Sequence, residues 1–296
     1  MTEEKINYIY EKPHAASLAD VYVEASRELL IPFESTPIES FPKFTKLTGG
    51  LRPKEYSILC GATGVGKTTL VGNLSKSLIN QRVPHFVASV ETGSTDYVKR
   101  IMSALIGEDW NTGDPVPVEK LQNFHSQHGH SFQSEYLWLS LYEDRFSAKK
   151  LMNDIAWMVE NKGCKVAIID NLNFFMDVTR AADQLIEMDR VTHELVVFCK
   201  NINVHVIMIM HPKKTDHGRV ESEFDVKGSS TAVQEASNVF LFNRPHEELI
   251  KEGHATKFDR ELKIAKMRRK GRAMGARMIL KCANGVTYTE GDIFCN

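Results

Sequence analysis

A glycine-rich segment followed by lysine and threonine has the clearest chemical meaning in this sequence. Residues 61–68 read Gly-Ala-Thr-Gly-Val-Gly-Lys-Thr and fit the pattern G-x-x-x-x-G-K-[ST]. Glycines let backbone N–H groups turn toward phosphate oxygens, and a helix that starts after the loop adds its positive end. Lys67 would reach the β and γ phosphates, and Thr68 would hold Mg²⁺. The residues expected to contact a nucleoside triphosphate are Gly61, Ala62, Thr63, Gly64, Val65, Gly66, Lys67, Thr68 and Thr69.

Three apolar runs further along the chain end in a polar residue, namely Glu91, Asp170 and His211. Parallel strands deliver their carboxyl ends to one edge of a sheet, the edge on which a phosphate-binding loop sits. There Asp170 would orient the hydration shell of Mg²⁺, Glu91 would polarise the attacking water, and His211 would sense the γ phosphate. A single polar residue at a strand end usually only meets solvent. The three together after such a loop favour a site of nucleotide hydrolysis.

The elements that must position these residues alternate along the chain from residue 41 onward. Short apolar runs are expected as strands at about 56–60, 85–90, 165–170 and 204–210, and amphipathic stretches as helices near 67–80, 94–106, 147–162 and 181–201. Closely spaced runs near 238–242, 261–267, 276–282 and 286–289 indicate antiparallel strands added to the sheet edge. We therefore predict an α/β fold, a mostly parallel twisted sheet with flanking helices and antiparallel C-terminal strands.

Residues 1–40 are expected to form an arm, separate from a domain at 41–296. Residues 17–30 carry an apolar helical stripe, and a connector with several prolines follows. The stripe consists of Leu18, Val21, Tyr22, Ala25 and Leu29. It would fold back on its own domain or, given the reach of the connector, dock on a neighbouring subunit.

Composition narrows the class of protein further. The 296 residues are 42% hydrophobic and 25% charged, which excludes a disordered chain, collagen and a coiled coil. The longest apolar runs fall short of the roughly 18 residues that a membrane span needs, and the acidic start lacks the order of a secretory signal, so a cytoplasmic protein is expected. The five cysteines have no paired spacing and are expected to be free thiols.

The net charge is −1, so any contact with nucleic acid must come from local clusters of basic residues. Residues 257–281 contain ten Lys or Arg against Asp259 and Glu261, a local charge of +8. Half of such runs are only solvated strand edges, but guanidinium groups aimed at a neighbour's γ phosphate would stabilise transition-state charge. A second cluster is expected to hold DNA phosphates from a flexible loop, with little base preference. Its residues are Lys213, Lys214, Arg219, Lys227, Gly228 and Ser229.

Two further groups of residues are weaker candidates. His125, His128 and His130 invite a metal-binding hypothesis, but no cysteine lies near them, and zinc is not favoured. Arg244 ends an apolar run and is a candidate for a phosphate contact at a subunit interface.

Taken together, these motifs resemble those of the RecA-like hexameric replicative helicases, the group of DnaB, Twinkle and the phage helicase-primases, over roughly residues 40–290. The matching segments are the lead-in at 41–51, the Walker lysine loop at 61–68, Ser89–Thr92, Ile169–Leu172, Met210–Lys214, Phe224–Asn238 and Ile264–Gly271. The resemblance implies a RecA-like P-loop ATPase with ATP and Mg²⁺ as cofactors. It also implies that Lys266 and Arg268 act as finger residues in the active site of a neighbouring subunit.

The sequence departs from the family in three places. Lys54 stands where the lead-in usually has glycine, and Arg269 and Lys270 replace more neutral residues, so either arginine of the pair 268–269 could act in trans, with Arg268 favoured. By this resemblance, the short arm is expected to stand in place of the usual amino-terminal primase-related domain. This resembles a stand-alone motor from a bacterial or phage-infected cell.

The function that these features favour is an ATP-dependent, ring-forming DNA helicase. It would assemble as a homo-oligomer, a hexameric ring by resemblance, translocate on single-stranded DNA, and work with a separate primase or loader and no membrane. Two other functions fit the same P-loop, Glu91 and Asp170. One is a recombinase-like filament protein, and the other is a KaiC-like ATP-gated regulatory ATPase.

Overall fold

The computed structural model describes residues 17–30, 34–89, 91–133, 135–141, 147–170, 181–213, 219–227, 230–269 and 271–295. It divides the chain into two units, Met1–Glu34 and Ser35–Asn296. The division lies before the predicted boundary at residue 40. Thr36 forms a two-way backbone bridge with Leu51 (N···O 2.7 and 2.8 Å), and Ile38 is buried in the core of the second unit. The end of the predicted connector therefore belongs to the second unit.

The described part of the first unit contains helix α1 (Leu18–Leu30), as the apolar stripe predicts. Its apolar side chains Leu18, Val21, Tyr22 and Leu29 are exposed. The surface that covers this stripe stays a prediction.

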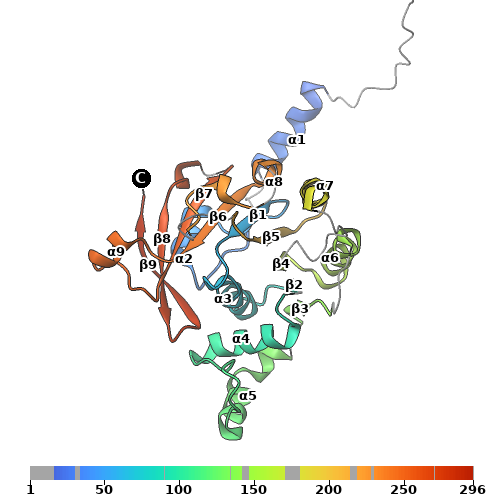
Figure 1. Ribbon diagram of the computed structural model, residues 1–296. Coiled ribbons are helices and arrows are strands. Elements are labelled where there is room, and N and C mark those ends of the chain that lie inside the picture. The colour runs from blue at the N-terminus through green and yellow to red at the C-terminus, as the bar shows by residue number, and fades with distance from the viewer. Residues whose placement is uncertain are drawn as a thin grey trace, which may run out of the picture. The chain divides into compact units, whose positions relative to one another are not determined.

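The second unit is built on a sheet that has nine strands among the described residues (Figure 1). Their spatial order is β3-β2-β4-β5-β1-β6-β7-β8-β9. The strands are β1 (Tyr56–Cys60), β2 (His85–Ser89), β3 (Leu137–Leu139), β4 (Val166–Asp170), β5 (His205–Met210), β6 (Asn238–Asn243), β7 (Arg260–Met267), β8 (Arg277–Ala283) and β9 (Thr287–Phe294). Pairs from β3 to β6 are parallel, and β7, β8 and β9 extend the sheet in antiparallel fashion, so the predicted α/β class is confirmed.

The predicted orientation of the run at 238–242 is wrong. Strand β6 pairs with β1 in parallel, with Ile58 opposite Val239. A parallel connection needs a dozen or more residues. The chain between Met210 and Asn238 supplies them and includes helix α8 (Ser230–Glu235), which is too short to stand out as a crossover helix in the sequence. The other three runs are antiparallel, as predicted.

Helices lie on both faces of the sheet (Figure 1). Four agree with prediction to within one residue at each end: α3 (Lys67–Asn80), α4 (Ser94–Ile106), α6 (Ala148–Lys162) and α7 (Ala181–Asn201). The ends of α6 show why, because the Ser147 hydroxyl accepts a hydrogen bond from the Lys150 amide and Gly163 turns the chain in the left-handed region (φ 66°). The remaining helices are α2 (Pro42–Thr48), α5 (Val118–Phe132) and α9 (Glu247–Lys251), with 3₁₀ turns η2 (Glu223–Asp225) and η3 (Gly271–Ala273).

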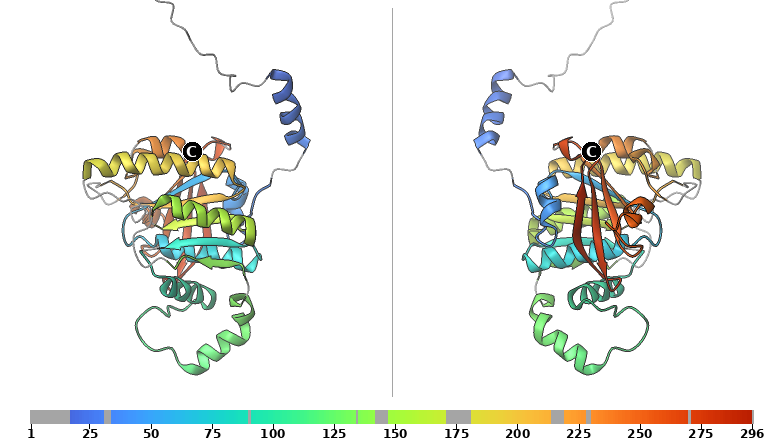
Figure 2. Two further views of the ribbon diagram at one scale, coloured as in Figure 1. Left: turned by 90° about the vertical axis from the view of Figure 1, so that its right-hand side faces the viewer. Right: turned by 90° about the vertical axis from the view of Figure 1, so that its left-hand side faces the viewer.

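Helix α5 was not predicted, and it lies beyond α4 on the side away from the sheet (Figure 2). Its sequence is polar and rich in histidine, and Phe124 is its one buried residue. The Phe124 ring packs edge-on against Trp110 and Phe132, at centroid distances of 5.5 and 5.3 Å. One aromatic anchor is too weak a periodic signal to reveal a helix in the sequence.

Alternation along the strands divides the core between the two faces. In β1, Ile58 packs into the cluster that contains Leu151 of α6 and Leu195 of α7. The next residue, Leu59, packs into the other cluster, which contains Leu74 of α3 and side chains of α2 and α4. Successive strand side chains point to opposite faces, so a sheet covered on both sides needs continuous apolar strands. This burial fixes the sheet and holds the carboxyl ends of its strands in place.

The five cysteines are free, as predicted, with Cys60, Cys164 and Cys199 buried. None of the helices in the described ranges combines the length and the apolar character needed to cross a bilayer.

Candidate nucleotide-binding site

The glycine-rich loop joins β1 to α3 and depends on its glycines for two different reasons. Gly64 and Gly66 have φ values of 74° and 99°, in the left-handed region that side chains avoid. A Cβ atom on Gly61 would lie 2.5 Å from the Phe242 carbonyl oxygen of the neighbouring strand, and one on Gly66 would lie 2.6 Å from the Tyr288 hydroxyl. The loop therefore needs both its backbone geometry and its lack of side chains.

Lys67 is the first residue of α3 and is buried. Its ammonium group donates hydrogen bonds to the carbonyl oxygens of Gly61 (2.7 Å) and Ala62 (3.0 Å), so it bridges the loop from within. Burial lowers the pKa of Lys67, and the negative charges of Asp170 and Glu91 partly oppose that effect. A desolvated cation inside a loop of backbone amides suits a phosphate group.

Asp170 ends β4 and is only 3% exposed. Burial, followed by the charge of Glu91, raises the pKa of Asp170 to about 6, against the opposing effects of Lys67 and of a hydrogen bond from Thr68. A carboxylate next to a hydroxyl offers the hard oxygen ligands that Mg²⁺ prefers. Because Mg²⁺ usually takes one or two protein ligands and completes its shell with water and phosphate, Thr68 and Asp170 fit such a site.

Glu91, which follows the end of β2, and His211, which follows the end of β5, complete the cluster. The His211 Nε2 lies 3.7 Å from a Glu91 carboxylate oxygen, and its Nδ1 lies 3.4 Å from both the Lys67 ammonium and the Thr63 hydroxyl. Burial and the positive charge of Lys67 lower the pKa of His211. The sheet order β2-β4-β5-β1 thus gathers the predicted residues beside the loop, as the rule for parallel strands predicts.

Two residues behind the loop were missed in the sequence. The Arg260 guanidinium donates from Nε to the Val65 carbonyl (2.5 Å), and the Tyr288 hydroxyl lies against Gly66. They come from β7 and β9, which are distant in sequence from the loop, and only the antiparallel pairing of these strands places them there. Arg260 and Tyr288 brace the loop from β7 and β9, and the Tyr288 amide also donates to the Asn73 side chain of α3 (3.1 Å).

The predicted DNA-binding segment begins directly after His211. The Lys227 amide donates to the His211 carbonyl (2.9 Å), and the Lys213 amide donates to the Asp225 carbonyl (2.7 Å), so residues 219–227 return to the end of β5. The flexible DNA-binding loop stays a prediction, because residues 214–218 and 228–229 lie outside the described residues. The side chains of Lys213 and Lys227 are exposed, whereas Lys214, Gly228 and Ser229 lie outside the described residues.

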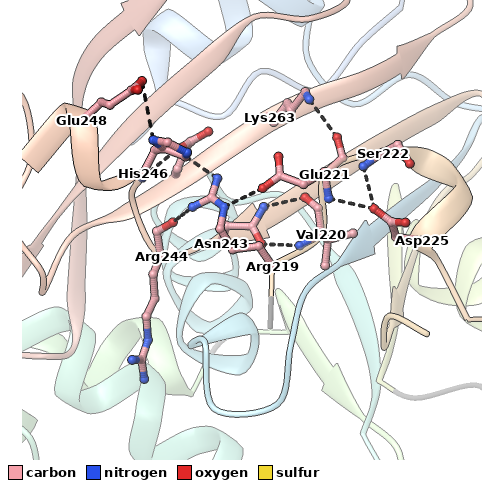
Figure 3. A network of polar contacts seen from close by, with 11 residues as sticks. Arg219, Val220, Glu221, Ser222, Asp225, Asn243, Arg244, His246, Glu248 and Lys263 are labelled. Carbon is pink, nitrogen blue, oxygen red and sulfur yellow. Dashed lines mark hydrogen bonds and ion pairs between the residues drawn. The ribbon is translucent and has the colours of Figure 1, made fainter. Parts of the chain in front are cut away.

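Arg219 belongs to a network of intramolecular contacts (Figure 3). Its guanidinium pairs with Glu221 (2.8 Å) and with the buried Glu261 (3.5 Å), and it donates to the Arg244 carbonyl. The Arg244 side chain points away from this network in Figure 3 and is exposed. Of the two arginines, Arg244 has the side chain that is more accessible to an external phosphate.

The predicted finger residues both contact the end of helix α8. The Lys266 ammonium donates to the carbonyls of Val233 (2.8 Å) and Gln234 (2.6 Å), and the Arg268 guanidinium donates to the same Gln234 carbonyl (2.7 Å). The last carbonyls of a helix lack partners within the helix and attract cations. In the single subunit, therefore, the two cations cap the helix that follows the predicted DNA-binding segment.

The residues described here contain no group of three or more His, Cys, Asp or Glu side chains arranged to hold a metal ion. Among the three histidines of α5, two pack their rings near Phe124 instead, His125 at 6.2 Å and His128 at 5.2 Å between centroids.

Comparison with known proteins finds relatives for most of the second unit. Residues 38–282 match the family model described as the DnaB-like helicase C terminal domain. A DNA helicase/primase from Enterobacteria phage T3 is 22% identical over 208 residues, which cover 67% of this chain and 36% of the phage protein. This chain therefore corresponds to about a third of that relative's length.

Two solved structures share the fold. One is that of a DnaB-like replicative helicase and its interactions with primase, with a TM-score of 0.73 and 14% identity over 93% of this chain and 67% of that one. The other is the structure of an ATPase domain, also with a TM-score of 0.73 and 14% identity, covering 93% of this chain and 99% of that one. At this identity the likeness concerns the fold alone.

Proposed function

Since this chain belongs to the family of DnaB-like helicase C-terminal domains, we propose that it hydrolyses ATP in order to translocate on single-stranded DNA and unwind duplex. The observation that carries the proposal is the meeting of four predicted residues beside the glycine-rich loop. His211 lies 3.4 Å from Lys67 and 3.7 Å from Glu91, and the charges of Lys67 and Glu91 both act on the buried Asp170. Phosphoryl transfer needs a cation, a metal ligand and a base, the roles proposed for Lys67, Asp170 and Glu91.

The proposed reaction is attack of water on the γ phosphorus with release of ADP. Lys67 and the loop amides bind the β and γ phosphates, and Thr68 and Asp170 would hold Mg²⁺, which when bound neutralises phosphate charge. Glu91 accepts the proton of the attacking water as the new P–O bond forms and the bond to the β–γ bridging oxygen breaks. His211 contacts both Lys67 and Glu91 and relays the loss of the γ phosphate to Lys227 through its backbone carbonyl.

The active site is proposed to be shared between subunits of a hexameric ring. Arg268 and Lys266 would leave the end of α8 and contact the γ phosphate held by the neighbouring subunit. Lys213, Lys227 and the residues around them would hold DNA phosphates, and α1 would dock on an adjacent subunit. A separate primase or loader and the cytoplasm of a bacterial or phage-infected cell complete the proposal.

The test is ATP hydrolysis with and without single-stranded DNA, together with unwinding of a forked duplex, for the wild type and for Lys67→Ala. DNA should stimulate hydrolysis by the wild type, and the variant should lose both activities. Lys251→Ala is the matched control, because this lysine is exposed on α9 and makes only a long ion pair with Glu247 (3.7 Å). It should keep both activities.

Three outcomes would contradict parts of the proposal. Turnover retained by Lys67→Ala would remove the glycine-rich loop from the mechanism. Strand exchange without unwinding would favour a recombinase-like filament. Hydrolysis that DNA leaves unchanged would favour a regulatory ATPase that acts on protein partners.

A further inference from the structure

The turn that follows β7 carries two adjacent arginines with different surroundings. The Arg268 backbone amide donates to the Ser237 carbonyl (3.0 Å), which fixes the start of the turn. The Arg268 side chain is exposed apart from its bond to α8. The Arg269 Nε, by contrast, lies 3.4 Å from Oε1 of Glu55. The Arg268 side chain thus contacts the end of α8, whereas the Arg269 side chain is tied to Glu55.

Glu55 immediately precedes β1, the strand that leads into the glycine-rich loop, and is 7% exposed. Its Oε1 also lies 4.0 Å from the Arg52 guanidinium, and its Oε2 accepts a hydrogen bond from Asn238 Nδ2 (3.0 Å). A buried carboxylate is stable only when cations and hydrogen-bond donors surround it. Arg269 is one of the two cations that satisfy this requirement here.

The carboxylate is itself held by a buried chain of hydrogen bonds at the amino ends of three strands. Asn238 Nδ2 also lies 3.0 Å from the Ser57 hydroxyl, that hydroxyl lies 3.0 Å from His205 Nε2, and His205 Nδ1 lies 2.7 Å from the Arg52 carbonyl. Ser57, His205 and Asn238 belong to β1, β5 and β6, and all three are buried. A fully bonded buried network has little freedom to move. Glu55 is therefore a rigid anchor.

We propose that Glu55 is a positioning residue for the finger, since its carboxylate holds Arg269 and thereby sets the direction in which Arg268 leaves the turn. This deepens the proposed function and rests on it. The two side chains are carried by adjacent residues of one turn, so fixing one restricts the backbone that carries the other. The same arrangement gives the two arginines different roles: Arg269 acts within its own subunit, and Arg268 acts on the neighbour.

The test uses Glu55→Gln, which keeps the size and the acceptor oxygen of the side chain but removes its charge. We expect a turnover about 10- to 100-fold below wild type, since displacement of a catalytic group by about 1 Å costs on that order. The affinity for ATP should stay within about twofold of wild type, because the substitution leaves the residues that bind ATP in the ground state unchanged. Arg269→Gln, at a half-exposed position, should give the same loss while Glu55 keeps Arg52 and Asn238 as partners, and Arg269→Lys should restore part of it.

Mixed assemblies separate a finger defect from damage to the subunit's own site. Glu55→Gln is combined in equal amounts with Lys67→Ala, whose finger is intact but whose loop is not. If pairing is random, about a quarter of the interfaces join an intact loop to an intact finger, and hydrolysis should rise toward about a quarter of the wild-type rate. Glu55→Gln mixed with Arg268→Ala contains no intact finger, so the rate of that mixture should not rise above the residual rate of Glu55→Gln alone.

Arg268→Ala mixed with Lys67→Ala is the reference for a shared site. If this reference mixture recovers while Glu55→Gln with Lys67→Ala does not, Glu55 acts on its own subunit's loop, and the positioning role is refuted although the shared site stands. Full turnover by Glu55→Gln alone would refute it as well. If the reference mixture itself stays inactive, the shared site of the proposed function fails and the inference falls with it.

Discussion

Replacing Asp170 by Asn should make the nucleotide-free protein more stable while it abolishes hydrolysis. The Asp170 side chain is almost wholly buried, and the folded state raises its pKa from 3.8 to about 6. Each pKa unit is worth about 1.4 kcal/mol, so keeping this carboxylate ionised in the folded state costs about 3 kcal/mol. Asparagine has nearly the same size, carries no charge, and keeps an oxygen that can accept the hydrogen bond from Thr68.

The dependence on pH follows from the same two pKa values. Between pH 3.8 and about 6 the folded chain holds a proton that the unfolded chain releases, so the free energy of unfolding falls as pH rises through this window. The full cost is present above about pH 7. The Asp170→Asn substitution should therefore raise the free energy of unfolding by about 3 kcal/mol at pH 7.5 and by about half as much at pH 5.

The assay is urea unfolding at pH 7.5 and pH 5 without Mg²⁺ or nucleotide. Glu160→Gln is the matched control, because Glu160 is an exposed carboxylate on α6, and it should change stability by less than about 0.5 kcal/mol at both pH values. Addition of Mg²⁺ and ATP should stabilise the wild type more than Asp170→Asn, since only the wild type keeps the charged ligand. An Asp170→Asn variant no more stable than wild type at pH 7.5, or one with the same advantage at both pH values, would refute the reasoning.

Three further predictions concern neighbouring residues. Lys54→Gly should stabilise the chain by about 0.5–1 kcal/mol in thermal unfolding, because Lys54 has a φ of 61° that costs a side chain about 1–2 kcal/mol; a lower melting temperature would contradict this. Arg260→Met should weaken ATP binding about tenfold or more in a titration, because the Val65 carbonyl loses a charged hydrogen-bond donor, and unchanged affinity would exclude the brace. His211→Gln should lose less stability than wild type between pH 7 and 5, because burial and Lys67 hold the pKa of His211 below 6.5 and its protonation opposes folding; equal losses would contradict this.

The sequence predicts the part of the site that lies at the carboxyl ends of the parallel strands. The pattern around Lys67 specifies its own loop, and Glu91, Asp170 and His211 end apolar runs whose carboxyl ends must share an edge. Partners that depend on antiparallel register could not be predicted, because the sequence does not state which residues of β7 and β9 face the loop. Arg260 was therefore missed.

The partners of basic residues could not be predicted from the sequence either. A run of charges in a sequence does not distinguish an exposed cation from one with a buried partner. Arg219 pairs with Glu261 and Arg269 pairs with Glu55, and both carboxylates lie far away along the chain. The sequence pattern places Arg219 in a DNA-binding cluster and favours Arg268 over Arg269 as the finger, but it does not reveal the carboxylates with which Arg219 and Arg269 pair.

Strand β7 connects the two kinds of site that the proposed mechanism requires. At its start, Arg260 braces the loop of its own subunit, and at its end Lys266 and Arg268 would serve the neighbour. Eight residues in a strand span about 26 Å, and β6 pairs with β7 from Glu261 to Met267 while β8 pairs with Arg260 to Lys263. Movement of the loop when nucleotide binds would therefore displace the far end of β7 as well, unless the buried Glu55 holds the turn in place. The anchor and the brace thus act on opposite ends of one strand, and their combined loss in a Glu55→Gln, Arg260→Met variant should exceed the sum of the single effects on turnover.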